Sequence, residues 1–250
     1  MASGRPTPAS DNVSRVNITT DAHLPTIEAN DPAHSPHEPK PSWRGWIHAG
    51  ALPVVIVATL LLLVFTPGLM PRLVCALYGL SSILLFGISA LYHRFNWSPR
   101  VRLALKRFDH ANIFLLIAST YSPISLLGLR EPESLILFFS VWSVAILGIF
   151  FRIFWTSAPR WLYVALYLAL GWSAVMFLPA LLQANWVMML LVAIGGILYT
   201  IGAVAYGMKK PNPWPGHFGF HELFHACTVL AYLCHWTAVL IIALNPVSLG

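Results

Sequence analysis

The stretch from Trp161 to Met208 contains no Asp, Glu, Lys or Arg, and it constrains the fold more than any other feature of the chain. As one α-helix it would be about 72 Å long, more than twice the roughly 30 Å hydrocarbon core of a bilayer. The stretch therefore predicts two membrane-spanning helices, with the break near Gln183-Ala184-Asn185. Only 10% of all residues are charged, against about 25% in soluble domains. We expect a multi-pass protein of the cell membrane.

Five further apolar runs are long enough to cross a bilayer. They are residues 47–65, 73–93, 109–129, 134–151 and 221–244. The chain is therefore predicted to be all-α, with a seven-helix transmembrane domain at residues 43–250. Residues 1–42 are expected to form a disordered cytoplasmic tail. Six prolines lie within the first 40 residues, and so few apolar side chains cannot offset the entropy of ordering.

The Lys and Arg residues are unevenly divided between the two ends of the predicted spans. With a cytoplasmic N-terminus, thirteen fall on the inner side, and only Arg72 and Arg130 fall on the outer side. Because Lys and Arg favour cytoplasmic loops, we predict that the N-terminus lies inside and the C-terminus outside. The net charge of +6 is accordingly interpreted as a topology signal and as contact with membrane lipids, not as nucleic-acid binding.

Histidines gather at the inner ends of the predicted spans. The second span ends at His93, and the first begins near His48. The last begins with His221 and His225, which lie four residues apart and so on one helix face. Alternating spans bring these residues to one layer near the cytoplasmic surface. Because three imidazoles with an open position recur in catalytic zinc sites, we predict that this layer, which holds His48, His93, His221 and His225, binds Zn²⁺.

Two neighbours of this site are candidate catalytic residues. Asp109 begins the predicted third span, at the level of the histidines, and could act as a general base toward a bound water. Ser89 lies one helical turn before His93, where it could orient the ligand or the water. The structural alternative is that each histidine bonds a carbonyl and that Asp109 caps its helix. His110 and His235 are interpreted as structural.

Four short motifs carry a family resemblance. They are Ser89-Ala90-Leu91-Tyr92-His93, Phe108-Asp109-His110, Thr120-Tyr121-Ser122-Pro123 and Phe220-His221-Glu222-Leu223-Phe224-His225. Together they resemble the hemolysin III proteins, the bacterial branch of the progestin and adiponectin receptor (PAQR) family, over about residues 43–245.

This resemblance implies a zinc site near the cytoplasmic face. It assigns the site to the residues Ser89, His93, Asp109, His221 and His225. A wider relationship to alkaline ceramidases implies hydrolysis of lipid amides. The chain departs from the family in its first span, where the pattern with Glu, Asn and Thr-His is replaced by Arg44-Gly45-Trp46-Ile47-His48 and only the His is kept.

Four functions remain open. The favoured one is a zinc-dependent hydrolase of lipid amide or ester bonds at the inner leaflet, with membrane lipids as partners and substrate. The first alternative is a non-enzymatic regulator or sensor of membrane lipids and fluidity, with structural zinc. A protease using the His-Glu-x-x-His pattern is less favoured, because no Asp or Glu follows Glu222. A pore-forming hemolysin is also less favoured, because the spans are mostly apolar.

Overall fold

The computed structural model describes residues 41–247, so the predicted tail lies outside the described residues except for its last two positions. Within this range the fold is all-α, and seven helical segments are long and apolar enough to span a membrane. They are α1 (Trp46–Phe65), α2 (Leu69–Arg94), α3 (Pro99–Gly128), α4 (Glu133–Phe154), the composite fifth span Arg160–Ala184, α7 (Trp186–Met208) and α8 (Phe220–Leu244). The predicted seven-helix membrane bundle is confirmed.

The fifth span is irregular. It consists of α5 (Arg160–Gly171), a 3₁₀ turn at Ser173–Phe177 and α6 (Leu178–Ala184). Pro179 lies in the first turn of α6, where its missing N–H costs no helical hydrogen bond. The predicted break before the sixth span is confirmed at Asn185, whose side-chain oxygen caps α7 by accepting a hydrogen bond from the Met188 N–H at 2.9 Å.

The prediction that the third helix begins at Asp109 is wrong, because α3 begins at Pro99. Proline suits the first helical position, and Arg and Lys are good helix formers, so the basic segment extends the helix. The basic residues on these added turns are Arg100, Arg102, Lys106 and Arg107. Asp109 therefore lies nearly three turns inside α3 and does not cap it.

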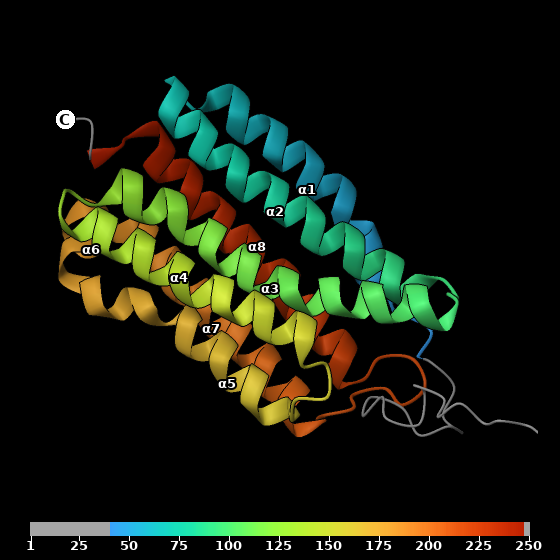
Figure 1. The fold of residues 1–250 in the computed structure, drawn as a ribbon. Coiled ribbons are helices and arrows are strands. Elements are labelled where there is room, and N and C mark those ends of the chain that lie inside the picture. The colour runs from blue at the N-terminus through green and yellow to red at the C-terminus, as the bar shows by residue number, and fades with distance from the viewer. Residues whose placement is uncertain (1–40, 248–250) are drawn as a thin grey trace, which may run out of the picture.

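Two helices form the centre of the bundle. In α3, 78% of the residues of an apolar 18-residue stretch are buried inside the protein. The corresponding share is 56% in α2, the next most buried span. Figure 1 shows α8 running through the middle of the bundle, where it contacts α1, α2, α3 and α7. Buried hydroxyls on α3 donate to carbonyls of their own helix at 2.7–3.0 Å, which satisfies polar groups that a bilayer cannot solvate. These hydroxyls belong to Ser119, Thr120, Ser122 and Ser125.

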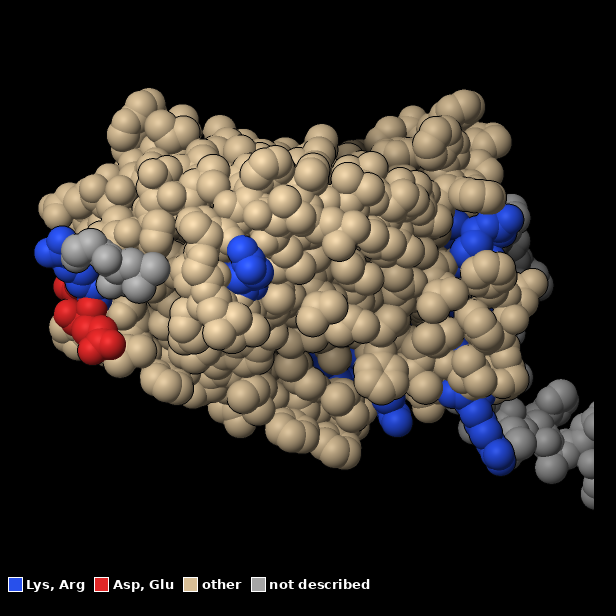
Figure 2. All heavy atoms as spheres, turned by 90° about the horizontal axis from the view of Figure 1, so that it is seen from above, with Lys and Arg blue, Asp and Glu red and all other residues tan. Residues whose placement is uncertain are grey.

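The outer surface is apolar. Large side chains such as Val64, Leu147 and Trp161 are 69–72% exposed. Figure 2 shows a broad face almost free of charge, with acidic side chains visible only at one end and most basic patches towards the other. Such a surface is suited to contact with lipid tails.

Candidate metal centre

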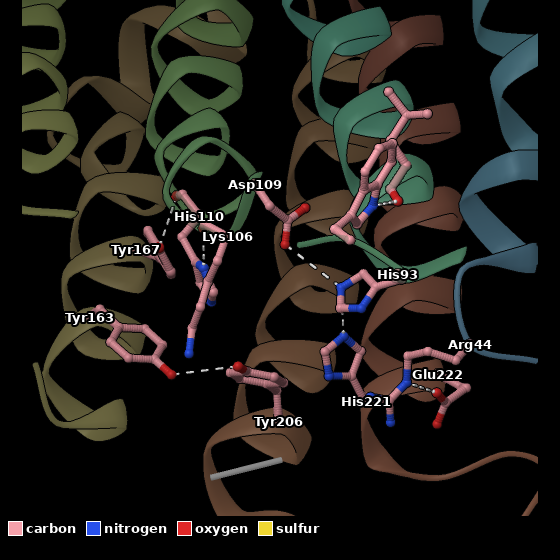
Figure 3. Close-up of polar contacts among 12 residues, drawn as sticks. Arg44, His93, Lys106, Asp109, His110, Tyr163, Tyr167, Tyr206, His221 and Glu222 are labelled. Atoms are coloured by element: carbon pink, nitrogen blue, oxygen red, sulfur yellow. Dashed lines mark hydrogen bonds and ion pairs between the residues drawn. The ribbon is translucent and has the colours of Figure 1, made fainter. Parts of the chain in front are cut away.

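Three histidine side chains meet where α2 ends and α8 begins. His93 lies in the last turn of α2, and His221 and His225 lie on successive turns of α8. The Nε2 atoms of His93 and His221 are 3.3 Å apart, and Figure 3 joins the two rings by a dashed line. The ring centre of His225 lies 5.1 Å from that of His93 and 4.6 Å from that of His221. One nitrogen of each ring lies within 4.8 Å of the others.

The donor set and its spacing fit a tetrahedral zinc ion. Zn–N bonds of about 2.0–2.1 Å place the ligand nitrogens of a tetrahedron about 3.3 Å apart, which matches the separation between His93 and His221. The Nδ1 atom of His221 is buried and has no hydrogen-bond partner among the described residues. The predicted ligands are thus brought together in an arrangement that could hold a metal ion.

Asp109 and Ser89 lie beside the three rings. The Oδ2 atom of Asp109 is 3.7 Å from the Nε2 atom of His93, and Figure 3 shows the carboxylate pointing from α3 towards that ring. Ser89 is buried one turn before His93, and it lines the same cavity as Asp109. Asp109 is therefore within reach of a small molecule held between the rings, while lying slightly too far from His93 for a direct hydrogen bond.

His48 supports the centre from α1. Its ring stacks on that of His225, with centroids 3.9 Å apart and an interplanar angle of 6°. Both of its ring nitrogens are buried without a hydrogen-bond partner in the described part of the chain. The predicted layer of histidines thus includes His48, although its nitrogens are not among the three that converge.

The two histidines interpreted as structural bond to main-chain carbonyls. The Nδ1 atom of His110 lies 2.7 Å from the Lys106 carbonyl oxygen, and the Nε2 atom of His235 lies 3.1 Å from the Val192 carbonyl oxygen. Neither belongs to the converging group. Such contacts are those expected of structural histidines, and the structural role of both residues stays a prediction.

A cavity opens beside the histidines and extends between α3, α5, α7 and α8. Its volume is about 1150 Å³, including the space at its open mouth. Along α3 its lining runs from Asp109 to Tyr121, roughly 18 Å at 1.5 Å per residue. The apolar part of the wall includes Ile113, Leu116, Ile117, Val164, Leu168 and Ala203. His221 and His225, two of the three candidate ligands, line the same space. A molecule with a long apolar chain and a polar group at one end fits this shape.

Two tyrosines at the histidine end were not identified from the sequence. The hydroxyl oxygens of Tyr163 on α5 and Tyr206 on α7 are 3.5 Å apart, and both residues line the cavity (Figure 3). The only available signal was the four-residue spacing of Tyr163 and Tyr167, which places both on one face of α5.

Glu222 lies next to His221 and is fully engaged. Its Oε1 atom pairs with the Nε atom of Arg44, and its Oε2 atom accepts a hydrogen bond from the Gly219 N–H at 2.9 Å. Its side chain is only 1% exposed, and it is not among the residues that line the cavity. The sequence marked Arg44 only as part of a departure from the family pattern and as a topology signal, and neither predicts its pairing with Glu222.

Comparison with known proteins identifies the family. The family described as "Haemolysin-III related" matches residues 37–236. Hemolysin-3 of Bacillus cereus is 36% identical over 135 residues, which are 53% of this chain and 61% of that protein. The Hemolysin-3 homolog of Bacillus subtilis (strain 168) is 33% identical over 151 residues, 60% of this chain and 68% of that protein.

A more distant similarity reaches the adiponectin-receptor-like proteins. The ADIPOR-like receptor IZH2 of Saccharomyces cerevisiae is 44% identical over 64 residues, 24% of this chain and 19% of that protein. The chain spans about three fifths of the length of the Bacillus cereus relative. Because the family match covers most of the chain and the fold contains seven apolar spans, this multi-pass membrane protein belongs to the haemolysin-III related family, within the wider group of PAQR proteins.

Proposed function

We propose that the chain is a zinc-dependent hydrolase that cleaves an amide or ester bond of a membrane lipid at the inner leaflet. One observation carries this proposal: three converging imidazoles and a carboxylate lie at the polar end of a long apolar cavity. The positive-inside distribution of Lys and Arg favours the inner leaflet for that end.

His93, His221 and His225 would hold the zinc ion. When bound, zinc supplies Lewis acidity, which polarises a carbonyl group and makes water acidic enough to lose a proton near neutral pH. The ligands come from regular helices, α2 and α8. Sites on such elements are held more rigidly than sites on loops.

Asp109 is the proposed general base. Its carboxylate lies beside His93 without bonding it directly, at 3.7 Å, so it can accept a proton from a molecule bound between the rings. Ser89 lines the same cavity and would fix the orientation of this carboxylate. General-base catalysis of this kind typically contributes about 10²–10⁴-fold to a rate.

The cavity would position the lipid chain. Because an acyl chain entering it leaves hydrocarbon and not water, burial supplies little hydrophobic free energy. The cavity therefore acts through shape, by holding the chain so that the scissile bond lies beside the histidines. The hydroxyls of Tyr163 and Tyr206 at the same end are suited to hydrogen bonding with the head group.

A non-enzymatic role is the second candidate, and the position of Asp109 also favours it. A zinc ion would connect α2 to α8, and a small movement of Asp109 would make it a fourth ligand from α3. Zinc would then fasten three helices of a lipid-sensing bundle. By contrast, a protease that uses Glu222 as its base is disfavoured, because both carboxylate oxygens are already engaged.

Asp109→Asn separates the hydrolase from the structural zinc site. Purified protein in lipid nanodiscs is assayed for zinc content, melting temperature and hydrolysis of ceramide-like amides and matching esters. The hydrolase predicts that the variant keeps zinc and fold and loses about 10²–10⁴-fold in turnover. Glu133→Gln, the same change in charge on an exposed residue at the start of α4, is the control and should keep full turnover.

Two outcomes would count against the hydrolase. If Asp109→Asn loses zinc and also melts at a lower temperature, Asp109 is a direct ligand of a structural zinc site. Zinc-loaded wild-type protein that turns over no lipid amide or ester would reject the enzymatic function itself.

A further inference from the structure

The residues immediately before α1 pack against the loop that leads into α8. The Ser42 N–H donates to the Gly216 carbonyl at 3.2 Å, and the Trp43 N–H donates to the His217 carbonyl at 3.3 Å. The Ser42 hydroxyl oxygen also lies 2.8 Å from the Nδ1 atom of His217. Two segments about 175 residues apart in the sequence are therefore joined directly beside the metal centre. We call residues 42–46 the N-terminal strap.

Arg44 of the N-terminal strap holds the first turn of α8. Its side chain is 8% exposed, and that of its partner Glu222 is 1% exposed. Figure 3 shows this ion pair next to His221. Glu222 also accepts the Gly219 N–H at the helix start, so Arg44 and the helix terminus fix one carboxylate from two sides. Fixing Glu222 fixes the rotation of the turn that presents His221 and, four residues later, His225.

Gly45 of the N-terminal strap fits against the end of α2. Its φ is +80°, and a Cβ atom there would lie 3.1 Å from the carbonyl carbon of His93 and 3.0 Å from the main-chain nitrogen of Arg94. Only glycine combines this backbone conformation with so close an approach at little cost. The guanidinium carbon of Arg94 lies over the ring of the next residue, Trp46, at 4.5 Å from the centre of that ring. The N-terminal strap thus lies against the main chain of His93, the third proposed ligand.

We propose that the N-terminal strap is a positioning device for the metal centre. Arg44 sets the direction of His221 and His225 through Glu222, and Gly45 sets the position of His93 through main-chain contact. Two consecutive residues thereby fix the two helix ends that must meet at ligand distance. This proposal rests on the metal centre proposed above, and neither Arg44 nor Gly45 is itself a ligand.

The test measures zinc affinity of the full-length protein by competition with a chromophoric chelator, at a temperature at which every variant is folded. Mutation of a group that contacts a metal ligand typically lowers metal affinity by about 10–100-fold. We expect Arg44→Gln and Gly45→Ala each to weaken zinc binding by about 10–100-fold. Arg44→Lys should restore part of the affinity, because a cation remains beside Glu222. Cobalt substituted for zinc should show altered visible absorption in the two weakened variants.

Matched controls separate positioning from general stability. Gly50→Ala is the control for Gly45, because an added Cβ meets no described atom within 4 Å there. Arg72→Gln is the control for Arg44, because Arg72 bonds a carbonyl at the other end of the bundle, that of Thr66. Both controls should bind zinc with wild-type affinity.

The double variant Arg44→Gln/Glu222→Gln keeps the proposal testable if Arg44→Gln does not fold. It removes both buried charges together, and so leaves no uncompensated carboxylate. It should still bind zinc about 10–100-fold more weakly than wild type. Wild-type affinity in Gly45→Ala and in the folded Arg44 variants, within twofold, would overturn the positioning role even if melting temperatures fell. Absence of zinc binding by the wild type would instead reject the metal centre.

Discussion

Adjacent glycines on α7 allow a controlled test of how α7 packs against α8. This helix carries His221 and His225, two of the three converging histidines. A Cβ atom added to Gly195 would lie 2.4 Å from the Cδ2 atom and 2.5 Å from the Nε2 atom of His235. A Cβ atom added to Gly196 would lie 3.7 Å from its nearest neighbour, the Trp172 ring. Gly195→Ala and Gly196→Ala therefore make the same chemical change in opposite surroundings.

The expected free energies of unfolding follow from these distances. Alanine is favoured over glycine inside a helix by about 1 kcal/mol, and this gain is common to both variants. At position 195 the clash costs about 1–3 kcal/mol in overpacking. Displacing the His235 ring also breaks its 3.1 Å hydrogen bond to the Val192 carbonyl, at a further cost of about 1–3 kcal/mol. Gly195→Ala should therefore be less stable than Gly196→Ala by about 2–6 kcal/mol.

Thermal unfolding of the two variants and wild type in one detergent measures this difference. At about 2–4 °C per kcal/mol for a domain of this size, Gly196→Ala should melt about 2–4 °C above wild type. Gly195→Ala should melt at least about 2 °C below wild type. Equal melting temperatures for the two variants would refute the packing described for α7 and α8.

Three further predictions concern the metal centre and the orientation of the chain. His93→Ala should lose most of its bound zinc by metal analysis, whereas His235→Gln should retain it; the reverse pattern would remove His93 from the ligand set. A reporter inserted after Trp97 should be cytoplasmic and one fused after Gly250 external, because Lys and Arg concentrate at the opposite end from the C-terminus; inverted signals would exclude an inner-leaflet site. Deletion of residues 1–38 should leave zinc affinity unchanged, because the N-terminal strap remains, and a loss of affinity would show that the deleted segment contributes.

The seven spans could be predicted from the sequence because a bilayer imposes a minimum length on every apolar helix. The charge-free stretch up to Met208 had to be broken, and Asn185 supplied a capping residue at the right place. The start of α3 could not be predicted in this way. Arg and Lys are compatible with a loop and with a helix that extends beyond the membrane, and Pro99 can end a loop as readily as begin a helix.

The three converging histidines were predicted from the sequence, but the contacts around them were not. Alternating spans fix the depth of His93, Asp109, His221 and His225 and so place them in one layer, and the family resemblance selects them within it. The remaining features of the site depend on how each helix is rotated about its own axis. Contacts with residues far away in the sequence set that rotation. The pairing of Arg44 with Glu222 and the cavity beside the irregular fifth span both depend on such rotations, so no local periodicity indicates either one.

Zinc K-edge X-ray absorption of the purified wild-type protein, loaded with one equivalent of zinc, tests the central claim most directly. The proposed centre predicts a four-coordinate ion with three imidazole nitrogens and one further light ligand, at about 2.0–2.1 Å. A sulfur ligand at about 2.3 Å, or a shell of oxygen atoms without imidazole scattering, would contradict it.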